Sequence, residues 1–355
     1  MPVGDLFFPT MPAISGVKLS AVSAGIKKNN QLDLMLIELP AAASVAGVFT
    51  QNAFCAAPVT VCREHITQQP RYLLVNAGNA NACTGKEGMA AALDCCSAIA
   101  SHASHASVLP QQVLPFSTGV IGELLPAQKI IDAVPKLLST LDENNWSLAA
   151  KSIMTTDTCA KGATRSFEYE GETIVVNGIA KGAGMIKPNM ATMLGFVATN
   201  ASIGQDLLNK LSFNAANQSF NRITIDGDTS TNDSCILIAS NHTSVKIEDA
   251  SGALYRLLER AVIDVHTELA QAIVRDGEGA TKFISVKVEE GATANECLQV
   301  AYAIAHSPLV KTACFASDPN WGRIVAAIGY AGVDALDVDK IRVYLGDVLI
   351  VENGG

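Results

Sequence analysis

The chain has 355 residues and a net charge of −9, and 49% of its residues are hydrophobic although only 5% are aromatic. This length predicts one large or two to three smaller units, with a core built from Ala, Val, Ile and Leu. No basic run is present, which argues against nucleic acid as a partner. No apolar run approaches the roughly 18 residues of a membrane span. We therefore expect a cytoplasmic protein that acts on small molecules.

Cysteine spacing and short motifs exclude most cofactor sites. The nine cysteines show no C-x-x-C repeat, which indicates reduced thiols and argues against zinc. The acidic segment 226–233 resembles the start of a calcium loop, but Thr231 occupies the position that requires glycine. No Walker A or G-x-G-x-x-G fingerprint occurs. We expect no metal and no bound cofactor.

Apolar runs and helical patterns alternate along the chain and predict an α/β fold. Strands are expected at 34–39, 72–75, 174–176 and 193–198, and helices at 88–101, 126–141 and 261–275. The loops after the strands, at 76–81, 117–119, 181–184 and 226–229, are rich in turn-forming residues, and binding sites usually lie on such loops.

The last part of the chain resembles a separate β-α-β unit. A strand is expected at 284–289, a helix at 293–305 with a capping box formed by Thr293 and Glu296, and a strand at 341–351. This predicts a division into residues 1–200, 201–282 and 283–355.

A glycine-rich loop leads into Thr192 at the mouth of an apolar strand. Gly182, Gly184 and Ala191 allow the backbone to kink, so that the Thr192 hydroxyl can reach the carbonyl of Ala191. Attack there gives an ester, and its hydrolysis leaves Thr192 with a free α-amine that can act as a base for its own hydroxyl. The alternative is a buried strand threonine in a tight turn.

Thr118 and Gly119 offer a hydroxyl and an unobstructed amide as oxyanion donors. The alternative is a strand-to-helix turn in which Ser117 or Thr118 caps the helix. In the segment 276–282, the glycines would present the carboxylate of Glu278 to a cationic amine. The alternative there is a solvated loop that ends a helix.

Six blocks together closely resemble the glutamate N-acetyltransferase family, also called ornithine acetyltransferases; they lie at 76–81, 117–119, 155–158, 181–196, 276–282 and 318–324. The resemblance implies a layered α/β sandwich of the self-cleaving type with a smaller C-terminal α+β unit. It also implies cleavage into an α chain, 1–191, and a β chain, 192–355, which assemble as α₂β₂.

In this family acetyl moves from N2-acetylornithine to the threonine nucleophile and then to glutamate, and many members also accept acetyl-CoA. By resemblance, Thr192 is the nucleophile, and Thr118 and Gly119 form the oxyanion hole. Thr158, Lys181, Thr192 and Glu278 contact the substrate.

The sequence departs from the family at Ala160, at Ala316 and at the C-terminus, where the family's final stretch is missing. We expect this to leave self-cleavage intact and to weaken transfer. Two alternatives stay open. One is a related self-cleaving aminopeptidase or amidase, which usually exposes Ser rather than Thr, and the other is an amino-acid-binding relative without turnover.

Overall fold

The computed structural model describes residues 1–103, 108–187, 193–334 and 336–355. The expected cleavage pair, Ala191 and Thr192, lies outside these ranges. The chain forms two compact units, Met1–Glu278 and Gly279–Gly355. The further division of the first unit at residue 200 stays a prediction.

Two β-sheets form the centre of the first unit. One has the order β1-β2-β4-β5, with β4 and β5 parallel and the other neighbours antiparallel. Its strands are β1 (Lys18–Val22), β2 (Leu34–Glu38), β4 (Tyr72–Asn79) and β5 (Val113–Val120). The other has the order β3-β10-β8-β7-β6, in which only β10 and β8 are parallel. Its strands are β3 (Ser44–Phe49), β6 (Lys161–Tyr169), β7 (Glu172–Lys181), β8 (Leu194–Thr199) and β10 (Ser234–Ala239). The short strands β9 (Ser202–Ile203) and β11 (Lys246–Ile247) pair separately.

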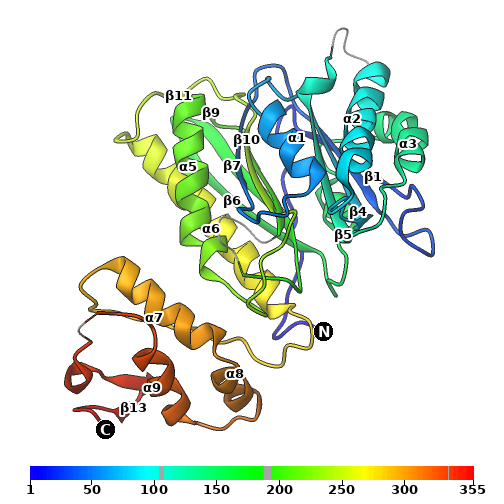
Figure 1. Ribbon diagram of the computed structural model, residues 1–355. Helices are drawn as coiled ribbons and strands as arrows, with labels where there is room; N and C mark the ends of the chain where they lie inside the picture. Colours follow the sequence, from blue (N-terminus) through cyan, green and yellow to red (C-terminus); the bar gives the residue numbers. More distant parts are fainter. Residues whose placement is uncertain (104–107, 188–192, 335) are drawn as a thin grey trace. The chain divides into compact units, whose positions relative to one another are not determined.

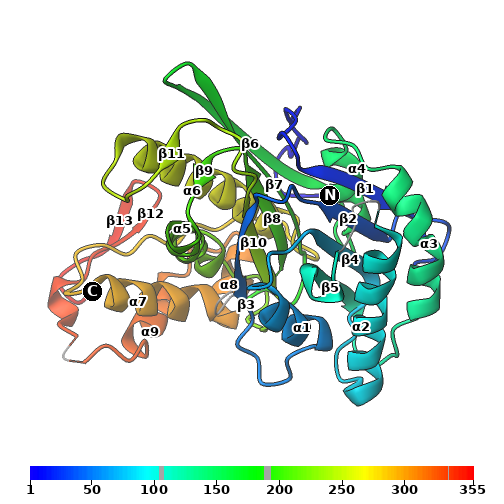
Figure 2. The ribbon, with the colours of Figure 1, turned by 90° about the horizontal axis from the view of Figure 1, so that it is seen from above.

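The two sheets pack face to face across an aliphatic core (Figure 2). Alternate residues of each strand point into this layer, as the period of two in a strand requires. The rings of Phe116 on β5 and Phe196 on β8 meet there edge to face, with centroids 5.1 Å apart. The core is therefore mainly aliphatic, as the composition predicts, with one aromatic pair linking the sheets.

Helices cover the outer faces of both sheets (Figure 1). On the first sheet lie α2 (Gly85–His102) and α3 (Ala127–Ser139), and on the second α5 (Gln205–Gln218) and α6 (Ala253–Arg275). In α3 the buried residues Ile130, Val134 and Leu137 recur at spacings of four and three, which places them on one face. Two shorter helices, α1 (Ala57–His65) and α4 (Trp146–Ser152), complete the unit. The expected layered α/β sandwich is confirmed.

Most predicted elements of this unit are present with shifted ends. The strands expected at 34–39, 72–75, 174–176 and 193–198 correspond to β2, β4, β7 and β8. The helices expected at 88–101, 126–141 and 261–275 correspond to α2, α3 and α6, of which α6 begins eight residues earlier, at Ala253. The earlier start follows from Leu254, Tyr255 and Leu258, which are buried on the same face as the predicted part.

The second unit is a small α+β structure, but its elements differ from the expected β-α-β order. It contains α7 (Ala294–His306), α8 (Pro308–Phe315), α9 (Trp321–Gly329), β12 (Val343–Leu345) and β13 (Val348–Val351). Half of the predicted capping box is present, since the hydroxyl of the N-cap residue Thr293 accepts from the Glu296 N–H at 3.2 Å. Glu296 Oε2 accepts from the Ala292 N–H at 3.0 Å, one residue before the N–H that a complete box would use.

Two strand predictions in this unit are wrong. Within the part of the chain that the structure describes, 284–289 pairs with no strand, and Val286 and Val288 only pack against the small core. The run 341–351 is a hairpin rather than one strand, because Gly346 adopts a φ of 58° and turns the chain back. Among the described residues no helix is long and apolar enough to cross a membrane.

Candidate active site

Lys181 and Thr118 join the two sheets at one end of the sandwich. Lys181 ends β7, and its Nζ donates to Thr118 Oγ1 near the end of β5 at 3.2 Å. Burial lowers the pKa of Lys181, and the carboxylates of Asp157, Asp233 and Glu278 only partly offset this. Two residues expected in different roles, oxyanion donor and substrate contact, are thus brought into direct contact.

The end of β5 is held by hydrogen bonds and by close backbone approach. Gly119 has a φ of 137°, and a Cβ there would lie 2.3 Å from the backbone carbon of Gly78 on β4. Only glycine fits this position. The Ser117 hydroxyl donates to Asn76 Oδ1 at 2.6 Å, and the Ser117 carbonyl accepts from Asn232 Nδ2 at 2.9 Å. Ser117 is therefore fixed inside the fold, which leaves Thr118 half-buried and Gly119 exposed.

Thr158 is bound to the end of helix α6. Its N–H donates to Asp276 Oδ2 at 2.9 Å, and its hydroxyl donates to Asp276 Oδ1. The buried ammonium of Lys161 donates to Asp276 Oδ2 at 2.6 Å and to Asp157 Oδ1 at 2.6 Å. All three charged side chains are fully buried. A buried cation between two carboxylates is the arrangement in which such charges are tolerated.

Asp157 connects this ion-pair group to the glycine loop, the segment 182–184 that follows β7. Its Oδ1 accepts from the Gly182 N–H at 2.7 Å, and its Oδ2 accepts from the Thr155 N–H at 2.9 Å. Burial alone would raise the pKa of Asp157, but the Lys181 and Lys161 ammonium groups and these hydrogen bonds outweigh it and lower the pKa to about 2. Asp157 is therefore ionised at neutral pH.

Glu278 lies against the same glycine loop. Its N–H donates to the Ala183 carbonyl at 2.8 Å, and a Cβ on Gly184 would lie 2.8 Å from Glu278 Oε1. The carboxylate itself is exposed. Thr158 and Gly119 are exposed as well, whereas Lys181, which is also expected to contact the substrate, is buried like Asp157, Lys161 and Asp276.

The described residues on both sides of 188–192 are anchored at this place. Before that stretch, the N–H groups of Met185 and Ile186 donate to the Asp226 carboxylate at 2.6 and 3.0 Å. After it, the Met193 carbonyl accepts from the Ser234 N–H at 2.9 Å. The acidic loop that resembles a calcium site in sequence thus holds backbone amides instead.

The candidate site contains four charged residues to which sequence reasoning gives no role. Asp157 and Asp276 lie inside two of the blocks quoted above, Lys161 begins β6, and Asp233 precedes β10. Burial raises the pKa of Asp233 well above its usual range, and its Oδ2 has no hydrogen-bond partner in the described ranges. In the sequence these four residues are charged positions beside predicted strands and loops. Charge alone does not show whether a side chain is buried or exposed.

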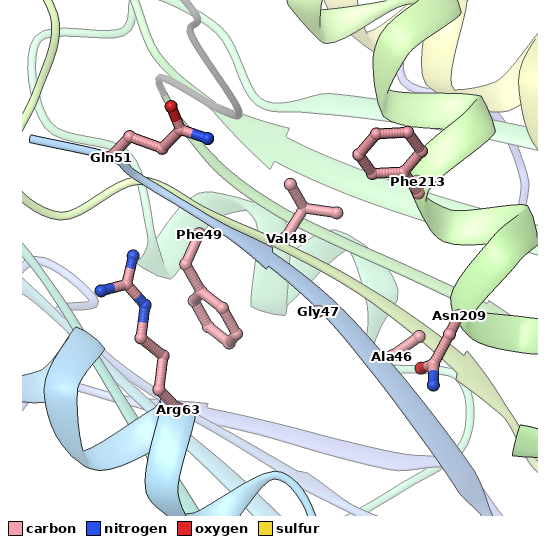
Figure 3. A pocket seen from close by; sticks show the side chains of 8 residues that line it. All are labelled: Ala46, Gly47, Val48, Phe49, Gln51, Arg63, Asn209 and Phe213. Carbon is pink, nitrogen blue, oxygen red and sulfur yellow. The ribbon is translucent and has the colours of Figure 1, made fainter. Parts of the chain in front are cut away.

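A groove of about 310 Å³ lies elsewhere on the first unit, along edge strand β3 and between α1 and α5 (Figure 3). It is lined by Ala46, Gly47, Val48, Phe49, Gln51, Arg63, Asn209 and Phe213. Every expected site residue that the structure describes is missing from this lining, so the groove is separate from the candidate site. Within the described ranges, His, Cys, Asp and Glu side chains form no group of three that could hold a metal ion.

Comparison with known proteins assigns the family. The model of the ArgJ family matches residues 18–355. The arginine biosynthesis bifunctional protein ArgJ of Pseudomonas fluorescens is 54% identical over 355 residues, which are 100% of this chain and 87% of that protein. The protein of the same name from Methylococcus capsulatus is 54% identical over 96% of this chain and 83% of its own.

Among solved structures, the arginine biosynthesis bifunctional protein argJ from Bacillus halodurans is 34% identical and aligns with a TM-score of 0.47, over 51% of this chain and 95% of that one. The family resemblance stated from the motifs is confirmed by the whole-length matches. The chain belongs to the ArgJ family.

Proposed function

We propose that this chain is a self-cleaving N-acetyltransferase of arginine biosynthesis that moves acetyl from N2-acetylornithine to glutamate through an ester on Thr192. The observation that carries this is the contact of Lys181 with Thr118, at 3.2 Å. This contact joins an expected oxyanion donor, Thr118, to an expected substrate residue, Lys181. It lies at the place where the residues before and after 188–192 are anchored. Membership of the ArgJ family supports the same reaction.

Maturation comes first in this proposal. The Thr192 hydroxyl attacks the carbonyl of Ala191, the peptide C–N bond breaks, and the freed α-amine takes the hydroxyl proton. Water then hydrolyses the ester, which yields the chains 1–191 and 192–355. We further propose that the two chains stay associated as α₂β₂.

Acetyl transfer uses Thr192 and the oxyanion donors in both of its steps. The α-amine of Thr192 removes the proton of its hydroxyl, which attacks the acetyl carbonyl, while the Thr118 hydroxyl and the Gly119 N–H donate to the developing oxyanion. The C–N bond breaks, ornithine leaves with the proton, and glutamate then attacks the acetyl ester in the reverse sense. In this proposal Glu278 binds the cationic δ-amine of ornithine, and Thr158 and Lys181 contact the rest of the substrate.

The experiment is a product assay with isotopically labelled acetylornithine, with and without glutamate. Labelled acetylglutamate in the presence of glutamate supports the proposal, and an assay with acetyl-CoA tests it as a second donor. Release of acetate at the same rate whether or not glutamate is present would instead assign a hydrolase.

A further inference from the structure

Lys161 is a buried cation that joins two loops of the candidate site. Its side chain is fully buried, and its Nζ lies 2.6 Å from Asp157 Oδ1 and 2.6 Å from Asp276 Oδ2. The carbonyl of Cys159 accepts a third, longer hydrogen bond at 3.5 Å. The three donor positions of the ammonium are thus directed at oxygen atoms of the protein, so Lys161 is not placed to bind a ligand itself.

The hydrogen bonds of Lys161 form two branches, one through each carboxylate. The branch through Asp157 leads to the glycine loop. The same Oδ1 that accepts from Lys161 also accepts from the Gly182 N–H at 2.7 Å. Gly182 follows Lys181 directly and has a φ of 152°, where side chains are disfavoured. Asp157 therefore sets the direction in which the chain leaves β7 toward 188–192.

The branch through Asp276 leads to the substrate residues. Asp276 Oδ2 accepts from both Lys161 Nζ and the Thr158 N–H, and its Oδ1 accepts from the Thr158 hydroxyl. Asp276 caps α6 two residues before Glu278, whose N–H is fixed on the Ala183 carbonyl at 2.8 Å. Asp276 therefore holds Thr158 directly, and as the residue that ends α6 it sets where the chain continues to Glu278.

We propose that Lys161 is a positioning residue with two separable branches. Asp157 positions the loop that undergoes self-cleavage, and Asp276 positions the groups that bind the acyl donor. This division rests on the proposed function, because it assigns the two branches to its two reactions. Lys161 couples them, since without it Asp276 would lose its ion-pair partner and Asp157 would keep only the more general attraction of the Lys181 ammonium.

The test compares Asp157→Asn, Asp276→Asn and Lys161→Met by two measurements. One is the rate at which the intact chain disappears after cell-free synthesis, and the other is the KM for acetylornithine of the matured protein. We expect Asp157→Asn to slow cleavage roughly tenfold or more with a smaller change in KM. We expect Asp276→Asn to raise KM by roughly tenfold or more with normal cleavage, as for the loss of a hydrogen bond to a charged group. Lys161→Met should show both effects.

A matched control is available on the same two elements. Arg165 on β6 and Glu268 on α6 form an ion pair of 2.8 Å with both side chains more than 40% exposed. Arg165→Met removes a cation between β6 and α6 without touching either branch, so both measurements should stay at wild-type values.

The two single carboxylate variants keep the test decisive if Lys161→Met does not fold. Equal effects of Asp157→Asn and Asp276→Asn on cleavage and on KM would overturn the division and leave a general structural role. Failure of the wild-type chain to cleave or to transfer would contradict the proposed function and this inference together. Normal wild-type activity together with wild-type cleavage of Asp157→Asn, or with an uncleaved Asp276→Asn chain, would contradict this inference alone.

Discussion

The ammonium of Lys181 and the hydroxyl oxygen of Thr118 lie 3.2 Å apart, although β7 and β5 belong to different sheets. The contact closes one end of the sandwich and directs a cation at an expected oxyanion donor. An oxyanion formed there would be stabilised by the hydroxyl and, at longer range, by the ammonium. The geometry of the site thus depends on how the two sheets are aligned. The contact between the Phe116 and Phe196 rings in the core stabilises that alignment.

Thr118→Ala should lower kcat by about 10²–10³ with little change in KM, the usual loss for one oxyanion donor. Thr118→Ser keeps the hydroxyl and should retain most of the rate. Steady-state kinetics with acetylornithine and glutamate measure both constants. An increase in KM at unchanged kcat would reassign Thr118 to substrate binding.

Gly119→Ala should reduce both stability and kcat. A Cβ at this position would meet the Gly78 backbone at 2.3 Å, and the φ of 137° is strained for alanine. We expect a loss of at least about 2 kcal/mol in the free energy of unfolding together with a loss in kcat. Gly122→Ala is the control, because its φ of 86° carries strain but no atom lies within 4 Å of the added carbon. Equal kcat in the two variants would argue against an oxyanion role for Gly119.

Glu278→Gln should raise the KM for acetylornithine by roughly 10- to 100-fold, the usual worth of a hydrogen bond to a charged group. Gly184→Ala should act in the same direction, since its Cβ would lie 2.8 Å from Glu278 Oε1 and displace the carboxylate. Glu64→Gln, which alters an exposed carboxylate on α1, serves as the control. Unchanged KM in Glu278→Gln would return this residue to a role in ending helix α6.

His266 should make the first unit less stable as pH falls from about 6.5 toward 4. Burial lowers the pKa of His266 from 6.5 to about 4, and its Nδ1 bonds the Val262 carbonyl at 2.8 Å. Because the folded pKa is lower, the unfolded chain binds more protons in this window, and stability is full above pH 6.5 and decreases below it. The loss is on the order of 3 kcal/mol.

Urea denaturation between pH 4 and 7 measures this dependence for the wild type and for His266→Gln. The variant should be less stable at pH 7, because the ring packs against Phe220 with centroids 5.4 Å apart, but its pH slope should be shallower. Identical slopes in the two proteins would show that His266 is not the group responsible.

The sandwich could be predicted from the sequence because its strands are short apolar runs and the apolar residues of its helices recur at spacings of three and four. The site was partly accessible, since Thr118, Lys181 and Glu278 lie in segments of recognisable composition, the first two near the ends of strands and the third in a loop. The pairing of Lys161 with Asp276 was not, because the two are 115 residues apart and meet only when β6 packs against α6. The strand expected at 284–289 failed for a similar reason, because alternating polarity describes a surface but supplies no partner strand.

The central claim is that the bond between Ala191 and Thr192 is cut by the Thr192 hydroxyl, and intact-mass analysis of the purified wild type and of Thr192→Ala tests it most directly. The proposed mechanism predicts two masses for the wild type, corresponding to 1–191 and 192–355, and one undivided chain without transferase activity for Thr192→Ala. A single undivided mass for a wild-type protein that transfers acetyl, or the same two fragments from Thr192→Ala, would contradict it.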